Sequence, residues 1–380
     1  MAHRKQPPSF CYSRTDPSPR FDSLDIACNK KLCGVILLLL GVSNLQQIEP
    51  RKPKVPCYFI FGDSLVDPGN NNELSTSAKS NYPPYGIDFP HGSTGRFSNG
   101  RTAPDFFAQY LGFENIIPPF TTAKGEEILQ GVNYASGSAG IRDETGTKLG
   151  INIGLNKQLE NYNITISFIV SILKAKDSAT KYLNQYLYSV GMGSNDYINN
   201  YFKPGYSTST KFIPEQYATI LIEQYSQQLT TLYSSGARKV ALGGLGPMGC
   251  TPDAVASHET YGKLCVEEMN NAVRIFNDKL KQLVDELHEK FKDAKFIFLD
   301  NFGGLIKHIS ILGTNYKITG CCEVVKETGQ CVPNTAPCRN SNLFIFFDSF
   351  HPSEAANPVT ATSQITSLHC LFDTNGFGYS

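Results

Sequence analysis

The chain has 380 residues, enough for one large domain or two small ones, and 41% of them are hydrophobic while 18% are charged. Its 34 basic side chains balance its 34 acidic ones, and no basic run is long enough to indicate a nucleic-acid partner. These numbers indicate a neutral, ordered, globular protein and leave its chemistry open.

The first 45 residues are predicted to form an extension with a signal-peptide-like segment. Residues 32–42 follow two lysines and are almost entirely apolar, which is too short for a membrane span and typical of a signal-peptide core. The polar residues 1–29 form an unusually long lead, so an uncleaved anchor and a buried core helix remain alternatives. Residues 46–56 are interpreted as a polar linker, and residues 57–380 as one domain.

From residue 57 onward, short apolar runs alternate with long amphipathic segments. We expect strands at 57–61, 186–190, 239–242 and 295–299, and helices at 214–235 and 265–291. Long helices between short apolar strands predict βαβ units, and therefore an α/β fold with a parallel sheet that helices cover on both faces. In such a sheet the functional loops follow the carboxyl ends of the strands.

The eleven cysteines favour disulfides in an oxidising compartment. Cys321, Cys322, Cys331 and Cys338 lie close together, without a C-x-x-C pair and without an interleaved histidine, so a metal site is the weaker alternative. The sequon at Asn163-Ile164-Thr165 fits a secreted glycoprotein, although such tripeptides are frequent by chance.

The first expected strand ends in Gly62-Asp63-Ser64, which places a serine at the carboxyl edge of the sheet. A serine there can act as a nucleophile, although a turn or helix-capping role is commoner for a serine that follows glycine. No serine in the chain satisfies G-x-S-x-G, because Val66 stands where that motif needs glycine, and an ordinary α/β-hydrolase is therefore disfavoured.

Two further loops carry side chains that ester cleavage needs. Asp348 and His351 are three residues apart and can hydrogen-bond, which fixes the imidazole tautomer, although a structural pair is the alternative. Asn195, in a Gly-Ser-Asn-Asp run after a strand, and the glycine-rich residues 133–140 can donate to an oxyanion. Each run alone is also compatible with an ordinary turn.

Taken together, these segments resemble the sequence blocks of the plant GDSL esterase/lipase family, within the SGNH hydrolase superfamily. The blocks occur in the family's order at residues 61–72, 95–101, 131–137, 193–197, 244–250 and 348–357. The resemblance covers roughly residues 55–357. It implies a three-layer, flavodoxin-like α/β/α sandwich with a central parallel sheet of about five strands.

The resemblance also implies a site. Ser64 would be the nucleophile, with Asp348 and His351 completing the triad. The oxyanion would be held by the backbone N–H groups of Ser64 and Gly137 and by the side-chain amide of Asn195. No metal or organic cofactor is implied.

The implied substrates are carboxylic esters, either lipid acyl esters or acyl groups on cell-wall material. The expected partner is thus a small-molecule, lipid or cell-wall ester. The protein is expected to be secreted and to act outside the cell. An acyltransferase that uses the same triad and a catalytically silent secreted binding protein are the alternatives.

The run Gly244-Leu245-Gly246-Pro247-Met248-Gly249 matches G-x-G-x-x-G, a dinucleotide-binding pattern. Because Pro247 stands where the dinucleotide-binding helix would begin, we interpret the run as a structural turn of the family. This interpretation includes a disulfide bond between Cys250, which directly follows the run, and Cys265. The tail after Asn357, which includes Cys370, departs from the family pattern.

Overall fold

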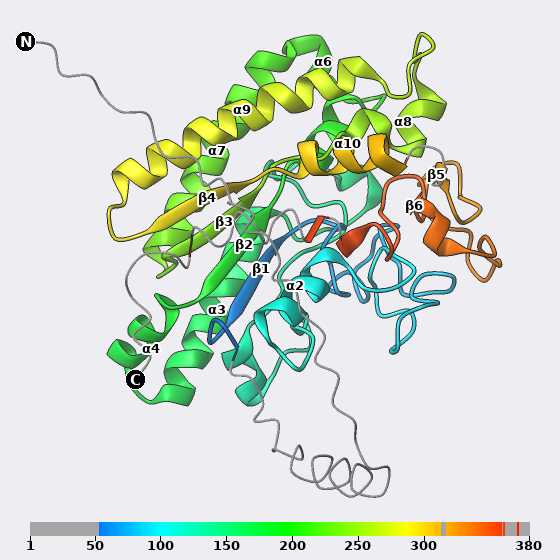
Figure 1. Cartoon of the computed structure of the whole chain (residues 1–380). Coiled ribbons are helices and arrows are strands. Elements are labelled where there is room, and N and C mark those ends of the chain that lie inside the picture. Colours follow the sequence, from blue (N-terminus) through cyan, green and yellow to red (C-terminus); the bar gives the residue numbers. More distant parts are fainter. Residues whose placement is uncertain (1–52, 313–316, 359, 362–370, 372–380) are drawn as a thin grey trace, which may run out of the picture. The chain divides into compact units, whose positions relative to one another are not determined.

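The computed structural model describes residues 53–312, 317–358, 360, 361 and 371 (Figure 1). The predicted extension, most of the predicted linker and Cys370 lie outside these residues, so the domain boundaries and the signal segment stay predictions. Within the described residues, no helix is both long enough and apolar enough to cross a membrane.

The strands are β1 (Tyr58–Gly62), β2 (Leu187–Gly191), β3 (Lys239–Gly243), β4 (Lys295–Leu299), β5 (Lys317–Gly320) and β6 (Phe344–Phe346). The α-helices are α2 (Ala103–Leu111), α3 (Leu155–Leu173), α4 (Lys176–Leu183), α5 (Ser194–Asp196), α6 (Thr208–Lys211), α7 (Pro214–Ser234), α8 (Pro252–Ser257), α9 (Glu267–Lys290) and α10 (Asn301–Leu312). The remaining short helices are the 3-10 helices η1 (Gly125–Gln130), η2 (Thr147–Leu149), η4 (Met248–Cys250) and η5 (Ser341–Leu343) and the π-helix η3 (Tyr197–Tyr201).

Strands β1 to β4 form one parallel sheet in chain order, which confirms the predicted sheet. Residues 132–134 extend it beyond β1: the N–H of Ile60 donates to Val132 at 3.1 Å, and that of Tyr134 donates to Ile60 at 2.8 Å. Residues 132–134 thus act as a short additional strand beside β1, so the sheet approaches the expected number of about five strands. The apolar run 343–347 contains β6, which pairs with β5 in a separate parallel sheet.

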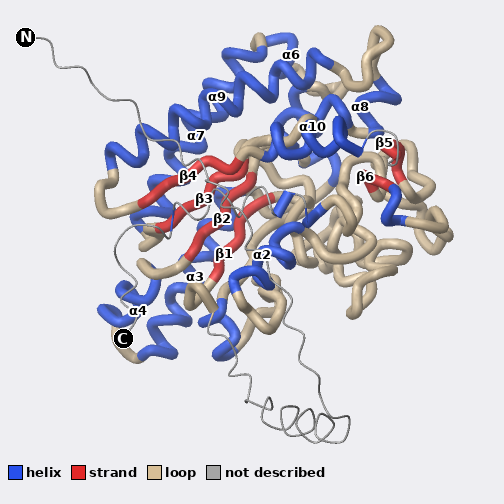
Figure 2. The backbone as a smooth tube through the Cα atoms, viewed as in Figure 1, coloured by secondary structure: helices blue, strands red, loops and turns tan. Residues whose placement is uncertain are grey.

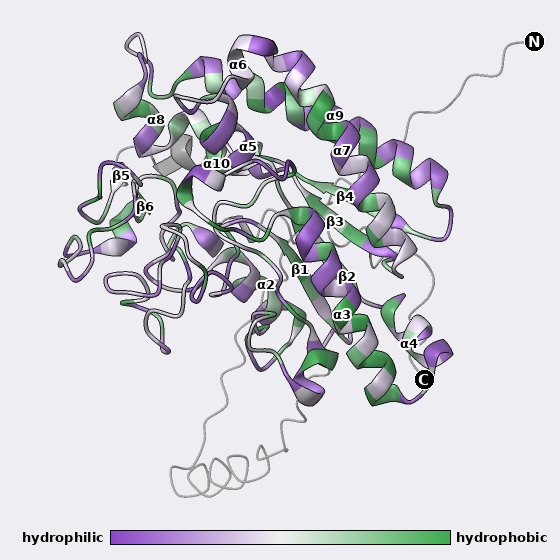
Figure 3. Ribbon diagram, turned by 180° about the vertical axis from the view of Figure 1, so that it is seen from behind, coloured by the Kyte–Doolittle hydropathy of each residue, from purple (hydrophilic) through white to green (hydrophobic). Residues whose placement is uncertain are grey.

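Alternate residues of β1 point into two different cores. Phe59 and Phe61 pack with the buried faces of α3, α7 and α9, whereas Tyr58 and Ile60 pack with Phe107 and neighbouring residues of α2. Helices therefore cover both faces, and the sheet is the middle layer (Figure 2). Figure 3 shows the strands as mostly hydrophobic and the covering helices as mixed, in keeping with one buried and one solvated helix face.

Three neighbouring strands end in glycine at the same level of the sheet. Gly62 pairs with Gly191, and Gly191 pairs with Gly243. A side chain on Gly62 would meet Val66 Cγ2 at 2.5 Å and the Gly191 carbonyl at 3.0 Å, whereas one on Gly191 would meet no atom within 4 Å. These three positions therefore carry no side chain at the carboxyl edge of the sheet. The loops that contain the predicted site residues begin at this edge.

A buried ion pair fixes α2 to the loop before it. The Arg96 guanidinium donates from Nε and Nη2 to the two carboxylate oxygens of Asp105, both at 2.8 Å, and both side chains are at most 7% exposed. Asp105 also accepts the N–H of Thr102, which starts the helix. Burial opposes ionisation of Asp105, but Arg96 outweighs it, and the pKa of Asp105 lies below its ordinary value.

Replacing Arg96 with methionine is expected to destabilise the fold by about 3–5 kcal/mol, because it leaves a buried carboxylate uncompensated. Chemical denaturation measures the change. The exposed pair Lys157–Glu160 provides a control, and Lys157→Met is expected to cost less than about 1 kcal/mol. Equal stability of the two variants would contradict this account of the Arg96 pair.

Candidate active site

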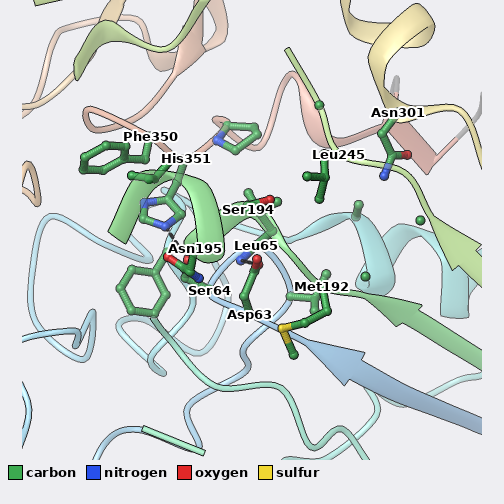
Figure 4. Close-up of a pocket in the computed structure, with 18 of the residues that line it drawn as sticks. Asp63, Ser64, Leu65, Met192, Ser194, Asn195, Leu245, Asn301, Phe350 and His351 are labelled. Carbon is green, nitrogen blue, oxygen red and sulfur yellow. Dashed lines mark hydrogen bonds between the residues drawn. The ribbon is translucent and has the colours of Figure 1, made fainter. Parts of the chain in front are cut away.

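Ser64, His351 and Asp348 form a continuous chain of hydrogen bonds at the carboxyl edge of the sheet. Figure 4 shows the part of this chain that joins Ser64 to His351. The Ser64 Oγ lies 2.8 Å from His351 Nε2, and His351 Nδ1 lies 2.7 Å from Asp348 Oδ2. Ser64 and His351 are 287 residues apart in the sequence. The structure thus brings together the three residues predicted to be catalytic, with the imidazole between the hydroxyl and the carboxylate.

Asp348 is fully buried and satisfied on both oxygens. Its Oδ1 accepts the backbone N–H groups of Phe350 and His351, both at 2.8 Å, in a turn that also orients the imidazole. Burial opposes its ionisation, yet the neighbouring His351 and the hydrogen bonds to both oxygens outweigh burial and lower the pKa of Asp348. The carboxylate is therefore charged at neutral pH.

The turn that carries Ser64 is held by hydrogen bonds on both sides. Asp63 accepts the N–H of Leu65 at 3.0 Å on its side chain and that of Val66 at 3.2 Å on its carbonyl. Burial raises the pKa of Asp63 to about 6. Before the turn, the side-chain amide of Gln158 on α3 both accepts the N–H of Gly62 and donates to its carbonyl. The end of β1 is thereby fixed, and half-buried Ser64 faces the cavity.

Asn195, at the start of α5, has its amide orientation fixed. The Nδ2 donates to the Ala139 carbonyl at 2.9 Å, and the Oδ1 accepts from Asn199 Nδ2 at 2.7 Å. An amide nitrogen carries two hydrogens, so a second one remains for a ligand. Asn195 lines the same cavity as Ser64 and His351.

Gly137 departs from its predicted role. Its N–H donates to the carboxylate of Asp67 at 2.8 Å, so in this structure that N–H is not free for an oxyanion. Asp67 is fully buried and gathers N–H groups of the loop after β1, including those of Gly69 and Asn70. The neighbouring Ser138, at φ 65°, lines the cavity in its place.

The G-x-G-x-x-G run at residues 244–249 is a turn that side-chain hydrogen bonds hold in place. The side-chain amide of Asn277 on α9 binds both the N–H and the carbonyl of Leu245, and the run leads into the single turn η4. A dinucleotide site would need a longer helix at this point. The structure therefore supports the interpretation of the run as a structural turn, and the predicted bridge Cys250–Cys265 is present.

Two more disulfides, Cys321–Cys338 and Cys322–Cys331, account for the cysteine cluster and confirm the disulfide interpretation. Among the described cysteines Cys57 alone is unbridged; it is buried at the start of β1. No group of three or more His, Cys, Asp or Glu side chains in the described part of the chain is arranged to hold a metal ion.

The hydroxyl of Ser64 opens into a cavity of about 220 Å³. The lining of the cavity as a whole is mainly apolar, with contributions from Leu65, Met192, Leu245 and Phe350, and it also includes the polar Ser194 and Asn301 (Figure 4). The cavity also borders Gly191, where the glycine row leaves space.

A profile of the GDSL-like lipase/acylhydrolase family matches residues 58–363, four fifths of the chain and all of the site. The chain belongs to the GDSL-like lipase/acylhydrolase family. One GDSL esterase/lipase of Arabidopsis thaliana is 48% identical over 331 residues, covering 86% of this chain and 91% of the relative. Another from the same plant is 50% identical over 336 residues, covering 87% and 91%.

Solved structures similar to this GDSL family member include an extracellular lipase from Streptomyces rimosus, 15% identical with a TM-score of 0.35, which covers 83% of this chain and 97% of that one. A phospholipase A1 from Streptomyces albidoflavus is 13% identical with a TM-score of 0.34, covering 85% and 100%. Membership in the GDSL family identifies the chain as a carboxylic ester hydrolase.

Replacing Asn195 with alanine is expected to lower kcat for ester hydrolysis by about 10²- to 10³-fold, because the cavity loses a fixed oxyanion donor. Steady-state kinetics on a p-nitrophenyl ester measures the change. Asn156→Ala is the control, since Asn156 is a half-buried α3 residue that binds Asp143 and Gln228 and lies outside the triad's cavity. A kcat for Asn195→Ala within about threefold of wild type would contradict the donor role.

Proposed function

We propose that this protein hydrolyses carboxylic esters through a covalent acyl intermediate on Ser64. The observation that carries the proposal is the unbroken series of hydrogen bonds from Ser64 Oγ through the imidazole of His351 to the buried carboxylate of Asp348. A hydroxyl bound to a base, which is itself oriented by a charged group, is the arrangement that nucleophilic catalysis requires.

In the first half-reaction Ser64 Oγ attacks the ester carbonyl carbon while His351 Nε2 takes the hydroxyl proton. The resulting tetrahedral oxyanion accepts hydrogen bonds from the N–H of Ser64 and from Nδ2 of Asn195. Collapse of this intermediate breaks the bond to the alcohol oxygen, and His351 returns the proton to the departing alcohol. Asp348 stays ionised throughout and stabilises the imidazolium.

In the second half-reaction water attacks the acyl-serine, with His351 Nε2 as the base. The same two donors stabilise the second oxyanion, whose collapse releases the carboxylic acid and returns the proton to Ser64 Oγ. If an alcohol took the place of water, the same steps would transfer the acyl group. Product analysis with and without added alcohol separates the hydrolase from the acyltransferase.

The substrate class is inferred from the cavity wall. Apolar side chains such as Met192, Leu245 and Phe350 surround the space next to Ser64, and binding sites of this kind select apolar ligand groups. We therefore place aliphatic acyl esters of lipids before acetyl or feruloyl esters of cell-wall material. A rise in kcat/KM from p-nitrophenyl acetate to the octanoate supports this order, and a steep fall contradicts it.

Covalent labelling tests the nucleophile directly. Wild-type protein treated with a fluorophosphonate is expected to lose esterase activity and to gain one phosphonyl group on the peptide that contains Ser64, as mass spectrometry of a digest would show. Labelling on a different residue, with activity lost in parallel, would overturn the assignment of Ser64. Absence of both labelling and hydrolysis in folded protein would favour the silent binding protein.

We also propose that the protein acts outside the cell. The three disulfides support this proposal, because such bonds persist in oxidising compartments. Asn163 of the sequon is exposed on α3, where a glycan has room. Expression in plant cells followed by assay of the medium, before and after deglycosylation, tests both points.

A further inference from the structure

Tyr85, which is not among the residues that line the cavity, contacts the acid of the triad. Its hydroxyl donates to Asp348 Oδ2 at 2.6 Å and accepts the backbone N–H of Cys331 at 3.1 Å. We propose that Tyr85 is a positioning residue for catalysis, which sets the rotation of the Asp348 carboxylate and through it the orientation of His351. The inference rests on the proposed function and adds to the three triad residues a fourth residue that positions them.

The geometry at Asp348 shows why this contact matters. The oxygen that Tyr85 contacts, Oδ2, is also the one nearest to His351 Nδ1, at 2.7 Å, while Oδ1 is held by the N–H groups of Phe350 and His351. With donors on both oxygens, the carboxylate cannot rotate without breaking several bonds to an ionised group, which are among the strongest in proteins. Tyr85 supplies the only side-chain donor to Asp348 besides His351 in the described part of the chain.

Tyr85 keeps its proton under all conditions in which the enzyme would work. Burial and the adjacent charge of Asp348 raise its pKa well above the ordinary value. The phenol is therefore always a donor, and it stabilises the ionised form of Asp348. Its function is to hold the carboxylate in place, and no proton needs to leave it.

The position of Tyr85 depends in turn on a loop with two disulfides, residues 321–338. Cys331, whose N–H binds the Tyr85 hydroxyl, is bridged to Cys322, and the N–H of Cys322 donates to the carbonyl of Phe347 just before Asp348. The Tyr85 ring also packs edge-on against Phe347, with ring centres 5.8 Å apart. One covalently closed loop thus holds both the acid and its donor.

Tyr82 offers a matched control. Its hydroxyl donates to the carbonyl of Cys331 at 3.1 Å, and its ring packs against that of Tyr85, but its hydroxyl has no hydrogen bond to Asp348. A purely structural role for phenols in this cluster predicts similar effects when either hydroxyl is removed. A positioning role predicts an effect on catalysis for Tyr85 alone.

The test compares Tyr85→Phe with Tyr82→Phe in p-nitrophenyl ester hydrolysis, with thermal unfolding measured for both. Removal of a supporting partner of this type costs about 10- to 100-fold in activity, and we expect Tyr85→Phe to show that fall in kcat with KM changed by less than about twofold. We expect Tyr82→Phe to retain kcat within about threefold of wild type. A kcat for Tyr85→Phe equal to that of Tyr82→Phe would overturn the proposal.

A second readout does not depend on turnover. The proton shared by His351 Nδ1 and Asp348 is expected to give a downfield NMR resonance, assigned by its absence in His351→Ala. Tyr85→Phe should shift or broaden this resonance and Tyr82→Phe should leave it unchanged. An unchanged resonance in Tyr85→Phe contradicts the positioning role. Wild-type protein that shows the resonance but neither hydrolyses esters nor reacts with fluorophosphonate would contradict the proposed function, and the resonance would still decide the role of Tyr85.

Discussion

Ser64→Ala is expected to lower kcat for ester hydrolysis by about 10⁴- to 10⁶-fold. Alanine removes the attacking oxygen and leaves His351 with no proton to accept. Since Ser64 is half-buried and the one hydrogen bond of its hydroxyl within the described residues is to His351, its loss should not disturb the turn held by Asp63 and Gln158. The thermal midpoint should therefore stay close to that of wild type.

The measurement is steady-state hydrolysis of p-nitrophenyl butyrate at saturating concentration, with circular dichroism to verify the fold. Ser234→Ala is the control, because Ser234 is an exposed α7 residue whose hydroxyl binds only the helix backbone at Thr230. The double variant Ser64→Ala/His351→Ala should be no slower than Ser64→Ala, since the two groups act as one unit. Residual activity above about a tenth of wild type in Ser64→Ala would exclude Ser64 as the nucleophile.

Asp348→Asn is expected to lower kcat by about 10⁴-fold without unfolding the protein. The asparagine keeps an oxygen for the backbone N–H groups of Phe350 and His351, but its amide cannot both accept the Nδ1 proton and carry the charge that stabilises the imidazolium. The imidazole then adopts the tautomer that holds a proton on Nε2, where Ser64 needs a base.

Kinetics between pH 5 and pH 9 measures this effect, with Asp300→Asn as the control, because Asp300 is an exposed residue that binds the N–H of Gly303. The pKa of Asp348 lies below its ordinary value in the folded protein, so its ionisation adds stability above the unfolded value of about 3.9, and that stability is lost as the pH falls through the folded pKa. An acid loss of activity near neutral pH therefore does not come from Asp348. A fall in kcat of less than about tenfold would contradict its assignment as the acid of the triad.

The predicted strands and helices agree with the structure wherever apolar periodicity is strong. The strand at 295–299 has the predicted bounds, and α9 buries Met269, Phe276 and Leu283 on one face as expected. The helix α3 was not predicted, because its buried face includes polar side chains such as Gln158 and Asn161. Gln158 is buried because it binds the backbone at the end of β1, and sequence periodicity carries no trace of that partner.

The site residues divide in the same way into those that a local sequence pattern indicates and those that depend on a distant partner. Ser64, Asp348, His351 and Asn195 are predicted because their short motifs together resemble the blocks of one family, although each motif alone is also compatible with an ordinary turn. The fold brings the four residues to one cavity edge. Tyr85 was not predicted, since its partner lies 263 residues away and nothing near it in the sequence indicates a carboxylate. For Gly137 the motif indicates a loop that borders the cavity through Ser138, but the direction of the Gly137 N–H depends on Asp67, whose position only the folded chain determines.

The row of glycines at Gly62, Gly191 and Gly243 limits which amino-acid substitutions can be accepted at these positions during evolution. A glycine has no side chain to lose, so every substitution in the row adds atoms. At Gly62 there is no room for them, whereas at Gly191 they would enter open space beside Ser64. Substitution at Gly191 is therefore expected to reduce the volume of the cavity, whereas shortening of a larger lining residue such as Leu245 or Phe350 is expected to increase it.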